Sequence, residues 1–159
     1  MTLHSWLDHV GTFSIARVTD VSERNMTNEE LISEAEKILN PHKTEDGRLH
    51  ADVGAALISR KGKLYVGTCV DTPSWGLCAE RSAIAAMITA GEYEIDKIVG
   101  VWRDEKTEKL YVLPPCGICR EFMRQIDRAN LDTDIVLGKH STRKLKDLIP
   151  FHKWPEPLD

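Results

Sequence analysis

Residues 78–84, CAERSAI, and residues 115–119, PCGIC, are the two stretches of this sequence that say most about its fold and its chemistry. They contain three cysteines, Cys78, Cys116 and Cys119, and one acid, Glu80. A structural zinc site is usually closed by four protein ligands, whereas a hydrolytic site keeps its fourth position for water. Three thiolates with a carboxylate close by therefore predict one catalytic zinc ion, held by the three cysteines.

Both motifs fall where helices are expected to begin. Small and apolar residues recur at helical spacing over residues 78–90 before Gly91, and a second helix is expected from about residue 116 to 128. The unpaired N–H groups and the positive dipole end of a helix N-terminus favour thiolate over thiol. Arg81 is expected to donate hydrogen bonds to the ligand sulfurs and so to offset part of the negative charge of three thiolates.

The rest of the sequence predicts a mixture of strands and helices. A capping box at residues 27–30 begins a helix, and residues 41–49 are polar and predict a loop. Alternation in residues 53–57 and 64–68 predicts a β-hairpin. Three more strands and a short helix are expected at residues 97–102, 110–113, 134–137 and 142–148. This order favours an α/β fold, a three-layer α/β/α sandwich with a mixed five-stranded sheet.

Length and composition describe an ordinary globular chain. Its 159 residues, 42% hydrophobic and 29% charged, suit one domain with a sizeable core. The formal net charge of −4 offers no basic field for a polyanion, so nucleic acid is not an expected partner. No apolar run is long enough for a membrane span, and no secretory signal is visible. The four cysteines therefore favour metal binding in a cytoplasmic protein over disulfides.

Further motifs make the sequence resemble the cytidine deaminase superfamily, and its small members in particular. The two cysteine motifs match the metal motifs of these enzymes, and VGAAL (53–57), GKLYVG (62–67) and LKDLIP (145–150) match their opening hairpin and closing motif. The similarity divides the chain into an N-terminal extension, 1–26, and a cytidine deaminase-like domain, 27–159. The resemblance implies the three-layer fold, one Zn²⁺ per chain and a homodimer or homotetramer, with Phe151 and Trp154 as candidate contact residues.

The resemblance also implies a reaction. Water activated by zinc adds to the ring carbon that bears the amino group of a cytosine nucleoside or related aminopyrimidine, and the uracil form and ammonia result. Glu80 is expected to take the proton from the water, deliver it to the ring nitrogen and later protonate the departing amine. In this role Glu80 is a proton shuttle and not a metal ligand.

The positions expected to bind substrate depart from the usual pattern of small cytidine deaminases. Alignment through VGAAL places Ala51, Cys69 and Asp71 where that group usually carries Phe, Asn and Glu, so plain cytidine is expected to be a poor substrate. Trp75, in the loop before the first cysteine motif, is either a pocket wall or core packing. Trp154 and the short 69–78 loop also resemble blasticidin-S deaminases, which act on a cytosine with a modified sugar and a guanidino tail. Asp71 and Asp52 would suit such a cationic substituent.

Other readings of the same residues stay open. If Cys69 is a fourth ligand, the site is a closed four-cysteine centre and the protein a non-catalytic, zinc-stabilised interaction domain. A polynucleotide deaminase would need a basic, aromatic channel, of which the sequence gives no sign. Glu80 could also be an ordinary exposed acid in the first turn of a helix. The six histidines are scattered and form no ligand spacing.

Overall fold

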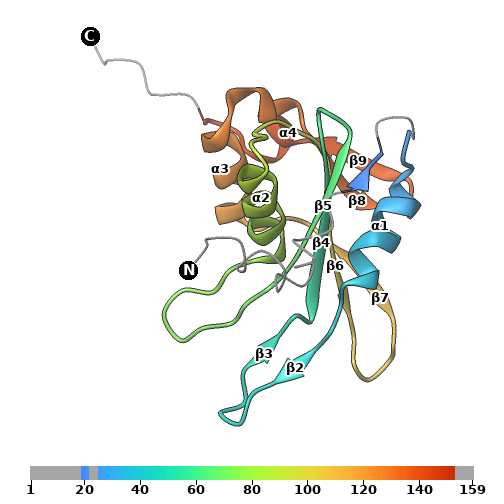
Figure 1. The fold of residues 1–159 in the computed structure, drawn as a ribbon, viewed down its shortest axis with the longest axis vertical. Coiled ribbons are helices and arrows are strands. Elements are labelled where there is room, and N and C mark those ends of the chain that lie inside the picture. The colour runs from blue at the N-terminus through green and yellow to red at the C-terminus, as the bar shows by residue number, and fades with distance from the viewer. Residues whose placement is uncertain (1–18, 22–24, 153–159) are drawn as a thin grey trace, which may run out of the picture.

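A mixed β-sheet covered by helices on both faces forms the body of the protein (Figure 1). The computed structural model describes residues 19–21 and 25–152. Helix α1 (Asn28–Lys37) packs on one face of the sheet. Helices α2 (Ala79–Thr89) and α3 (Gly117–Ile126) cover the other face. The predicted three-layer α/β/α class is therefore confirmed.

The sheet has seven strands where the sequence predicted five. Its order is β1-β5-β4-β6-β8-β9, and β7 pairs with β6 on the same side as β8. Pairing is antiparallel except between β6 and β8, so the sheet is mixed, as expected. The strands are β1 (Thr19–Asp20), β4 (Val53–Ser59), β5 (Lys63–Thr68), β6 (Ile95–Arg103), β7 (Leu110–Leu113), β8 (Asp134–Gly138) and β9 (Ser141–Lys144).

Three local predictions need correction. The short helix expected from residue 142 begins only at Leu145 as α4 (Leu145–Leu148), because the residues before it pair with β8 as β9. The helix expected to reach residue 128 ends at Ile126 and is followed by a 3-10 helix, Arg128–Asp132. The expected loop 41–49 contains β2 (His42–Lys43), which pairs with β3 (Leu49–His50) as a separate small sheet.

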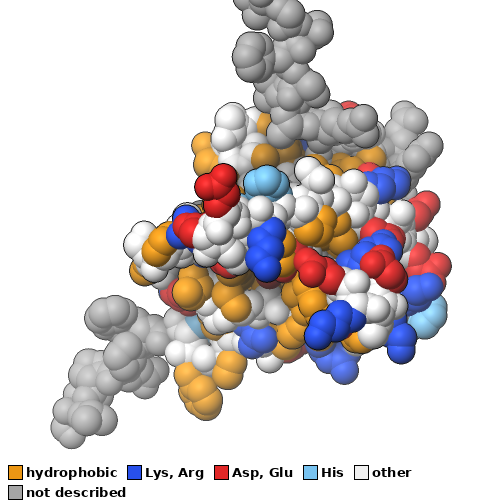
Figure 2. Space-filling model, turned by 90° about the horizontal axis from the view of Figure 1, so that it is seen from below, with side chains coloured by type: hydrophobic (Ala, Val, Ile, Leu, Met, Phe, Trp, Pro, Cys, Tyr) orange, Lys and Arg blue, Asp and Glu red, His pale blue; other side chains and the backbone are white. Residues whose placement is uncertain are grey.

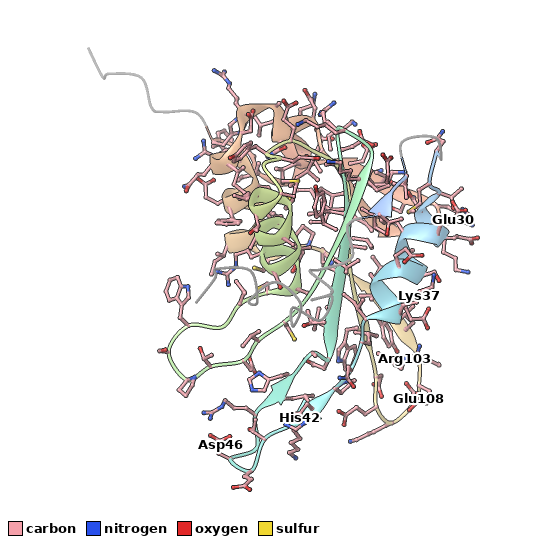
Figure 3. The ribbon with its side chains drawn as sticks, viewed as in Figure 1. Glu30, Lys37, His42, Asp46, Arg103 and Glu108 are labelled. Atoms are coloured by element: carbon pink, nitrogen blue, oxygen red, sulfur yellow. The ribbon has the colours of Figure 1, made fainter. Side chains whose placement is uncertain are left out.

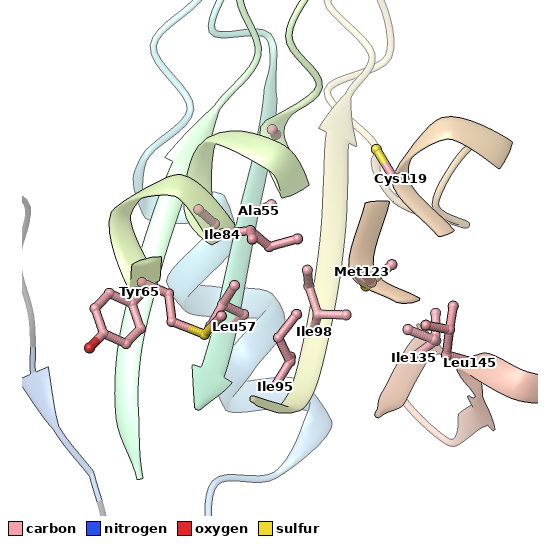
Figure 4. Packing of buried hydrophobic residues seen from close by; sticks show 13 residues of the cluster. Ala55, Leu57, Tyr65, Ile84, Ile95, Ile98, Cys119, Met123, Ile135 and Leu145 are labelled. Carbon is pink, nitrogen blue, oxygen red and sulfur yellow. The ribbon is translucent and has the colours of Figure 1, made fainter. Parts of the chain in front are cut away.

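The interior consists of two apolar clusters, one on each face of the sheet. The cluster on the α2 and α3 side contains Leu57, Tyr65, Ile84, Met87, Ile98, Met123, Ile135 and Leu145, several of them shown in Figure 4. The cluster on the α1 side contains Leu31, Ala35, Ala56, Val99, Val101 and Val136, together with Val21 and Met26 from the predicted extension. Burial on both faces explains why the central strands are almost continuously apolar in sequence.

Two glycines let the helices approach the sheet closely. A Cβ atom at Gly67 of β5 would lie 2.3 Å from the backbone nitrogen of Ala83 in α2. A Cβ atom at Gly54 of β4 would lie 2.3 Å from the backbone oxygen of Ala35 in α1. Both distances are far below van der Waals contact, so only glycine at these two positions allows α1 and α2 to pack this close to the sheet.

A fully buried amide joins the end of α3 to the start of β6. The Asn130 side chain accepts a hydrogen bond from the Ile95 backbone N–H at 2.8 Å. It donates to the backbone oxygens of Tyr93 and Met123 at 3.0 Å each. All the polar atoms of this amide are thus partnered inside the protein, as burial of an amide requires.

The substitution Asn130→Ala is expected to lower the free energy of unfolding by about 3 kcal/mol, because it leaves several buried backbone groups without a partner. Urea denaturation followed by circular dichroism measures the change. Asn40→Ala, at an exposed position, is the matched control and should change the free energy of unfolding by less than about 0.5 kcal/mol. Equal stability of the two variants would contradict the structural role of Asn130.

None of the described helices is long and apolar enough to cross a membrane.

Candidate metal centre

Three cysteine thiols converge between the N-termini of α2 and α3. The Sγ atoms of Cys78, Cys116 and Cys119 lie within 4.8 Å of one another. Cys78 and Cys116 are 3.8 Å apart, and Cys116 and Cys119 are 3.5 Å apart. Among the described residues, no other His, Cys, Asp or Glu joins this group. The three thiols predicted from the sequence are therefore brought together, in a donor set that suits zinc with one position left open.

The helix termini place these thiols. Cys78 is the N-cap residue of α2 and Cys116 is the N-cap residue of α3, and neither side chain makes a capping hydrogen bond. Cys119 lies one turn into α3, so the two-residue spacer returns its thiol to the side of Cys116. The N-termini of two helices, with their positive dipole ends, therefore point toward the same small volume, and the thiols of both N-cap residues are available to a metal there.

The thiols differ in how easily they lose a proton. Burial raises the pKa of Cys119, and the nearby Glu80 carboxylate raises it further. Burial also raises the pKa of Cys78. At Cys116, burial raises the pKa, but the nearby backbone N–H groups of Cys119 and Ile118 and the neighbouring thiols outweigh it, and the pKa is lowered. A bound cation would stabilise all three thiolates together, which is what the donor set requires.

Glu80 is buried beside the thiols. It lies in the first turn of α2 and is only 7% exposed, so the alternative of a solvent-facing acid is wrong. A Cβ atom built at Gly100 of β6 would lie 3.7 Å from Oε1 of Glu80, so the carboxylate rests against the sheet at that glycine. Burial raises the pKa of Glu80, and the neighbouring Cys119 thiol opposes part of this effect.

Arg81 joins the loop before α2 to the metal centre. Its Nη2 donates to the backbone oxygen of Gly76 at 2.6 Å. Burial lowers the pKa of Arg81, but its interactions with Cys78 and Cys119 outweigh this and raise it. The guanidinium therefore lies in the electrostatic field of two thiols, and its donation of hydrogen bonds to the ligand sulfurs stays a prediction.

Cys69 lies outside the group of converging thiols. Its Sγ donates to Oδ1 of Asp52 at 3.0 Å, and burial raises the pKa of this thiol. Ala51, next to Asp52, has a positive φ of 57° and donates its N–H to the Cys69 carbonyl at 3.1 Å. This geometry gives no support to a closed four-cysteine centre. It places Ala51 and Cys69 side by side at the ends of β4 and β5.

Two of the other expected substrate residues, Asp71 and Trp75, are on the surface. Asp71 is exposed, and its backbone N–H donates to Nδ1 of His50 at 3.1 Å. Trp75 is 73% exposed, so the alternative of core packing is wrong and a pocket wall is the reading that stays. Trp154 lies outside the described residues, and Phe151 is fully exposed.

Arg120, the residue directly after the PCGIC motif, was given no role from the sequence. Arg120 donates from Nε to the Pro115 carbonyl at 2.8 Å and from Nη1 to the Leu148 carbonyl at 3.0 Å. It thereby fixes the segment that leads into Cys116 against the end of α4. Its place directly after the second cysteine was the only sequence signal for this function.

Comparison with known proteins agrees with this geometry. Residues 26–132 match the family model described as the cytidine and deoxycytidylate deaminase zinc-binding region. A cytidine deaminase of Halalkalibacterium halodurans is 36% identical over 88 residues, which are 54% of this chain and 61% of that protein. The blasticidin-S deaminase of Bacillus cereus is 29% identical over 118 residues, 67% of this chain and 79% of that protein.

Solved structures give the same result for the fold. The crystal structure of cytidine deaminase from Burkholderia pseudomallei superimposes with a TM-score of 0.61 at 28% identity, over 79% of this chain and 98% of that one. The sequence matches are shorter: they span 61% of the Halalkalibacterium halodurans enzyme and 48% of a probable cytidine deaminase of Dictyostelium discoideum.

Proposed function

This chain belongs to the cytidine and deoxycytidylate deaminase family, and from that premise we propose that it is a zinc-dependent hydrolytic deaminase of a cytosine nucleoside or related aminopyrimidine. The products are the uracil form and ammonia. One observation carries the proposal: Cys78, Cys116 and Cys119 converge within 4.8 Å, and the buried carboxylate of Glu80 lies beside them.

The residues of the centre have separate tasks in this reaction. Cys78, Cys116 and Cys119 would hold the zinc ion, which would lower the pKa of a bound water to about 7 and so supply a nucleophile near neutral pH. Glu80 would accept one proton of that water and donate it to the ring nitrogen. It would then take the hydroxyl proton of the tetrahedral adduct and give it to the amine, so that the carbonyl forms as ammonia leaves. Because burial raises the pKa of Glu80, both of its protonation states are more accessible near neutral pH than for an exposed acid. Arg81 and Arg120 hold the segments that enter α2 and α3.

The substrate carries a substituent on the ribose side of cytosine, or a sugar bound in an unusual way. Ala51 and Cys69 offer neither a ring nor an amide at the end of β4 and β5, whereas Asp71 offers a carboxylate for a sugar hydroxyl. A blasticidin-S-type activity is the second candidate, because the match to that enzyme extends over 67% of this chain. Asp52 and Asp71 supply negative charge suited to its cationic tail.

Small molecules suit this surface better than nucleic acid. The face seen in Figure 2 carries Lys and Arg side chains interspersed with Asp and Glu, and the net charge of the chain is −4. A polynucleotide would need a continuous basic channel. The proposed location is the cytoplasm, where free thiols stay reduced and available to the metal. Cell fractionation tests that location.

The protein is also proposed to form a homodimer or homotetramer. Ile118, between two metal ligands, is 56% exposed, and Phe151 is exposed near the described C-terminal end. Apolar side chains at such places are candidates for contact with a second copy. Light scattering during gel filtration gives the mass directly, and a monomer at micromolar concentration would contradict this proposal.

Ammonia release by the zinc-loaded protein tests the proposed activity. Cytidine, deoxycytidine, cytosine and blasticidin S are compared, each with Glu80→Gln in parallel. Turnover that disappears in the variant supports the deaminase, and the preferred compound identifies the substrate branch. No turnover of any of the four by fully zinc-loaded protein would contradict the proposed function.

The substitution Asp71→Asn is expected to raise the KM for the preferred nucleoside about tenfold, because a charged hydrogen-bond acceptor for the sugar is lost. The kcat value should change little, since Asp71 is remote from the reacting carbon in the proposed arrangement. Asp96→Asn, at another exposed aspartate at the start of β6, is the matched control. An unchanged KM in Asp71→Asn would remove this residue from the substrate site.

A further inference from the structure

Strand β6 presents alternate side chains to the two faces of the sheet. Ile98 belongs to the cluster under α2 and α3, and Gly100 lies under the Glu80 carboxylate. Val99 and Val101 belong to the opposite cluster, under α1. Because the period of a strand is two residues, Trp102 lies on the same face as Gly100 and Glu80.

The next residue confirms this alternation. Arg103 lies on the α1 side, where it forms an ion pair with Glu36 of α1 and lies 3.7 Å from Glu108 (Figure 3). On β4, the residue opposite Trp102 is Val53, which packs against the cluster under α2. Neighbours along and across the sheet thus place Trp102 on the face of the metal centre.

A second aromatic ring stands beside Trp102. Tyr111 of β7 is directly opposite Trp102 in the strand register, and the two ring centroids are 5.6 Å apart with a tilt of 32°. Trp102 is only half-buried, and Tyr111 is 44% exposed. The pair is therefore not fully buried in the core, and part of its aromatic surface is accessible to another molecule.

The aromatic pair lies further along β6 from the glycine that faces Glu80. Two residues along a strand span about 7 Å, so Trp102 is one such step beyond the glycine under the carboxylate. If the amino-bearing carbon of the substrate's pyrimidine is held near Glu80, the rest of the substrate would therefore extend toward the aromatic pair. Aromatic side chains bind flat heterocycles by stacking and edge contacts.

We propose that the Trp102–Tyr111 pair is the aromatic surface against which the substrate packs beside the metal centre. This inference rests on the proposed function, because it assigns the contact surface of the same substrate. It makes Trp102 and Tyr111 specificity-determining residues, with no part in proton transfer.

For whichever of cytidine, deoxycytidine and blasticidin S the wild type turns over best, Trp102→Ala is expected to raise the KM about tenfold, equivalent to about 1.4 kcal/mol, while kcat stays within about threefold of the wild type. Trp102→Phe should recover most of the loss, since it restores a ring. Tyr93→Ala removes an exposed tyrosine just beyond α2, away from the β6–β7 pair, and should leave KM unchanged. These values come from initial rates of ammonia release.

Calorimetric titration of that same compound into zinc-loaded Glu80→Gln protein measures binding without turnover. Adding Trp102→Ala or Tyr111→Ala to that background should weaken its binding about tenfold. Tyr111→Ala keeps the inference testable if Trp102→Ala fails to fold, because Tyr111 is the more exposed ring. Unchanged affinity in Tyr111→Ala, or an unchanged KM in folded Trp102→Ala with an active wild type, would overturn this inference alone. Absence of both turnover and binding of all three compounds in the wild type would overturn it together with the proposed function.

Discussion

Replacing Glu80 by Gln is expected to reduce kcat by at least about 10³-fold while the protein keeps one zinc ion per chain. The amide cannot accept a proton from water or return it to the leaving amine, but it preserves the size of the side chain and lies outside the group of converging thiols. Ammonia release and metal analysis of the same preparation measure the two quantities. Glu94→Gln, at an exposed glutamate after α2, is the matched control and should keep wild-type activity. Retention of a tenth of the activity in Glu80→Gln would exclude the proton-shuttle role.

The same substitution should not destabilise the metal-free protein. Burial raises the pKa of Glu80, so the folded chain binds this proton more tightly than the unfolded chain does. The contribution of Glu80 to stability therefore falls as the pH rises through the raised pKa, and at neutral pH the ionised carboxylate is unfavourable. We expect Glu80→Gln to unfold at the same or a higher temperature at pH 7. A lower Tm would show that the carboxylate has a stabilising partner in the folded protein.

The substitution Cys119→Ala is expected to remove zinc, leaving less than about 0.1 ion per chain, and with it all deaminase activity. Cys119 is fully buried between the other two thiols and Glu80, so water cannot easily replace its sulfur. Inductively coupled plasma mass spectrometry after gel filtration measures the metal. Circular dichroism shows whether the variant is folded.

Cys69→Ala is the matched control for that experiment. Its thiol donates to Asp52 and lies outside the metal group, so this variant should keep one zinc ion per chain. Loss of zinc from Cys69→Ala would favour a closed four-cysteine centre and the non-catalytic interaction domain. Retention of zinc by Cys119→Ala would contradict the three-cysteine centre itself.

The metal centre could be predicted from sequence because its information is local. Cys116 and Cys119 are one helical turn apart, and Cys78 and Glu80 share the first turn of another helix, so spacing alone brought each pair together. The capping box at Thr27 and Glu30 was equally local, and both of its hydrogen bonds are present. Patterns that a single element can satisfy are the ones that sequence reports most directly.

Features that depend on pairing between distant segments were missed. Residues 141–144 lack the alternation of a half-buried strand, and only their hydrogen bonds to β8 make them one. Asn130 has partners far along the chain, at Tyr93 and Ile95. The contact between Trp102 and Tyr111 requires the register of β6 and β7, which no local pattern contains. Tertiary context outweighs local propensity in all three cases.

The central sheet also separates the positions where substitutions leave the metal centre untouched from those where they do not. Its two apolar clusters share strands but no side chains, and the three proposed metal ligands lie on the α2 and α3 face. Substitutions among residues such as Leu31 and Val99 should therefore combine additively with changes near the thiols. The α1 side is thus the half in which sequence drift, or deliberate thermostabilisation, can proceed while the reaction is conserved.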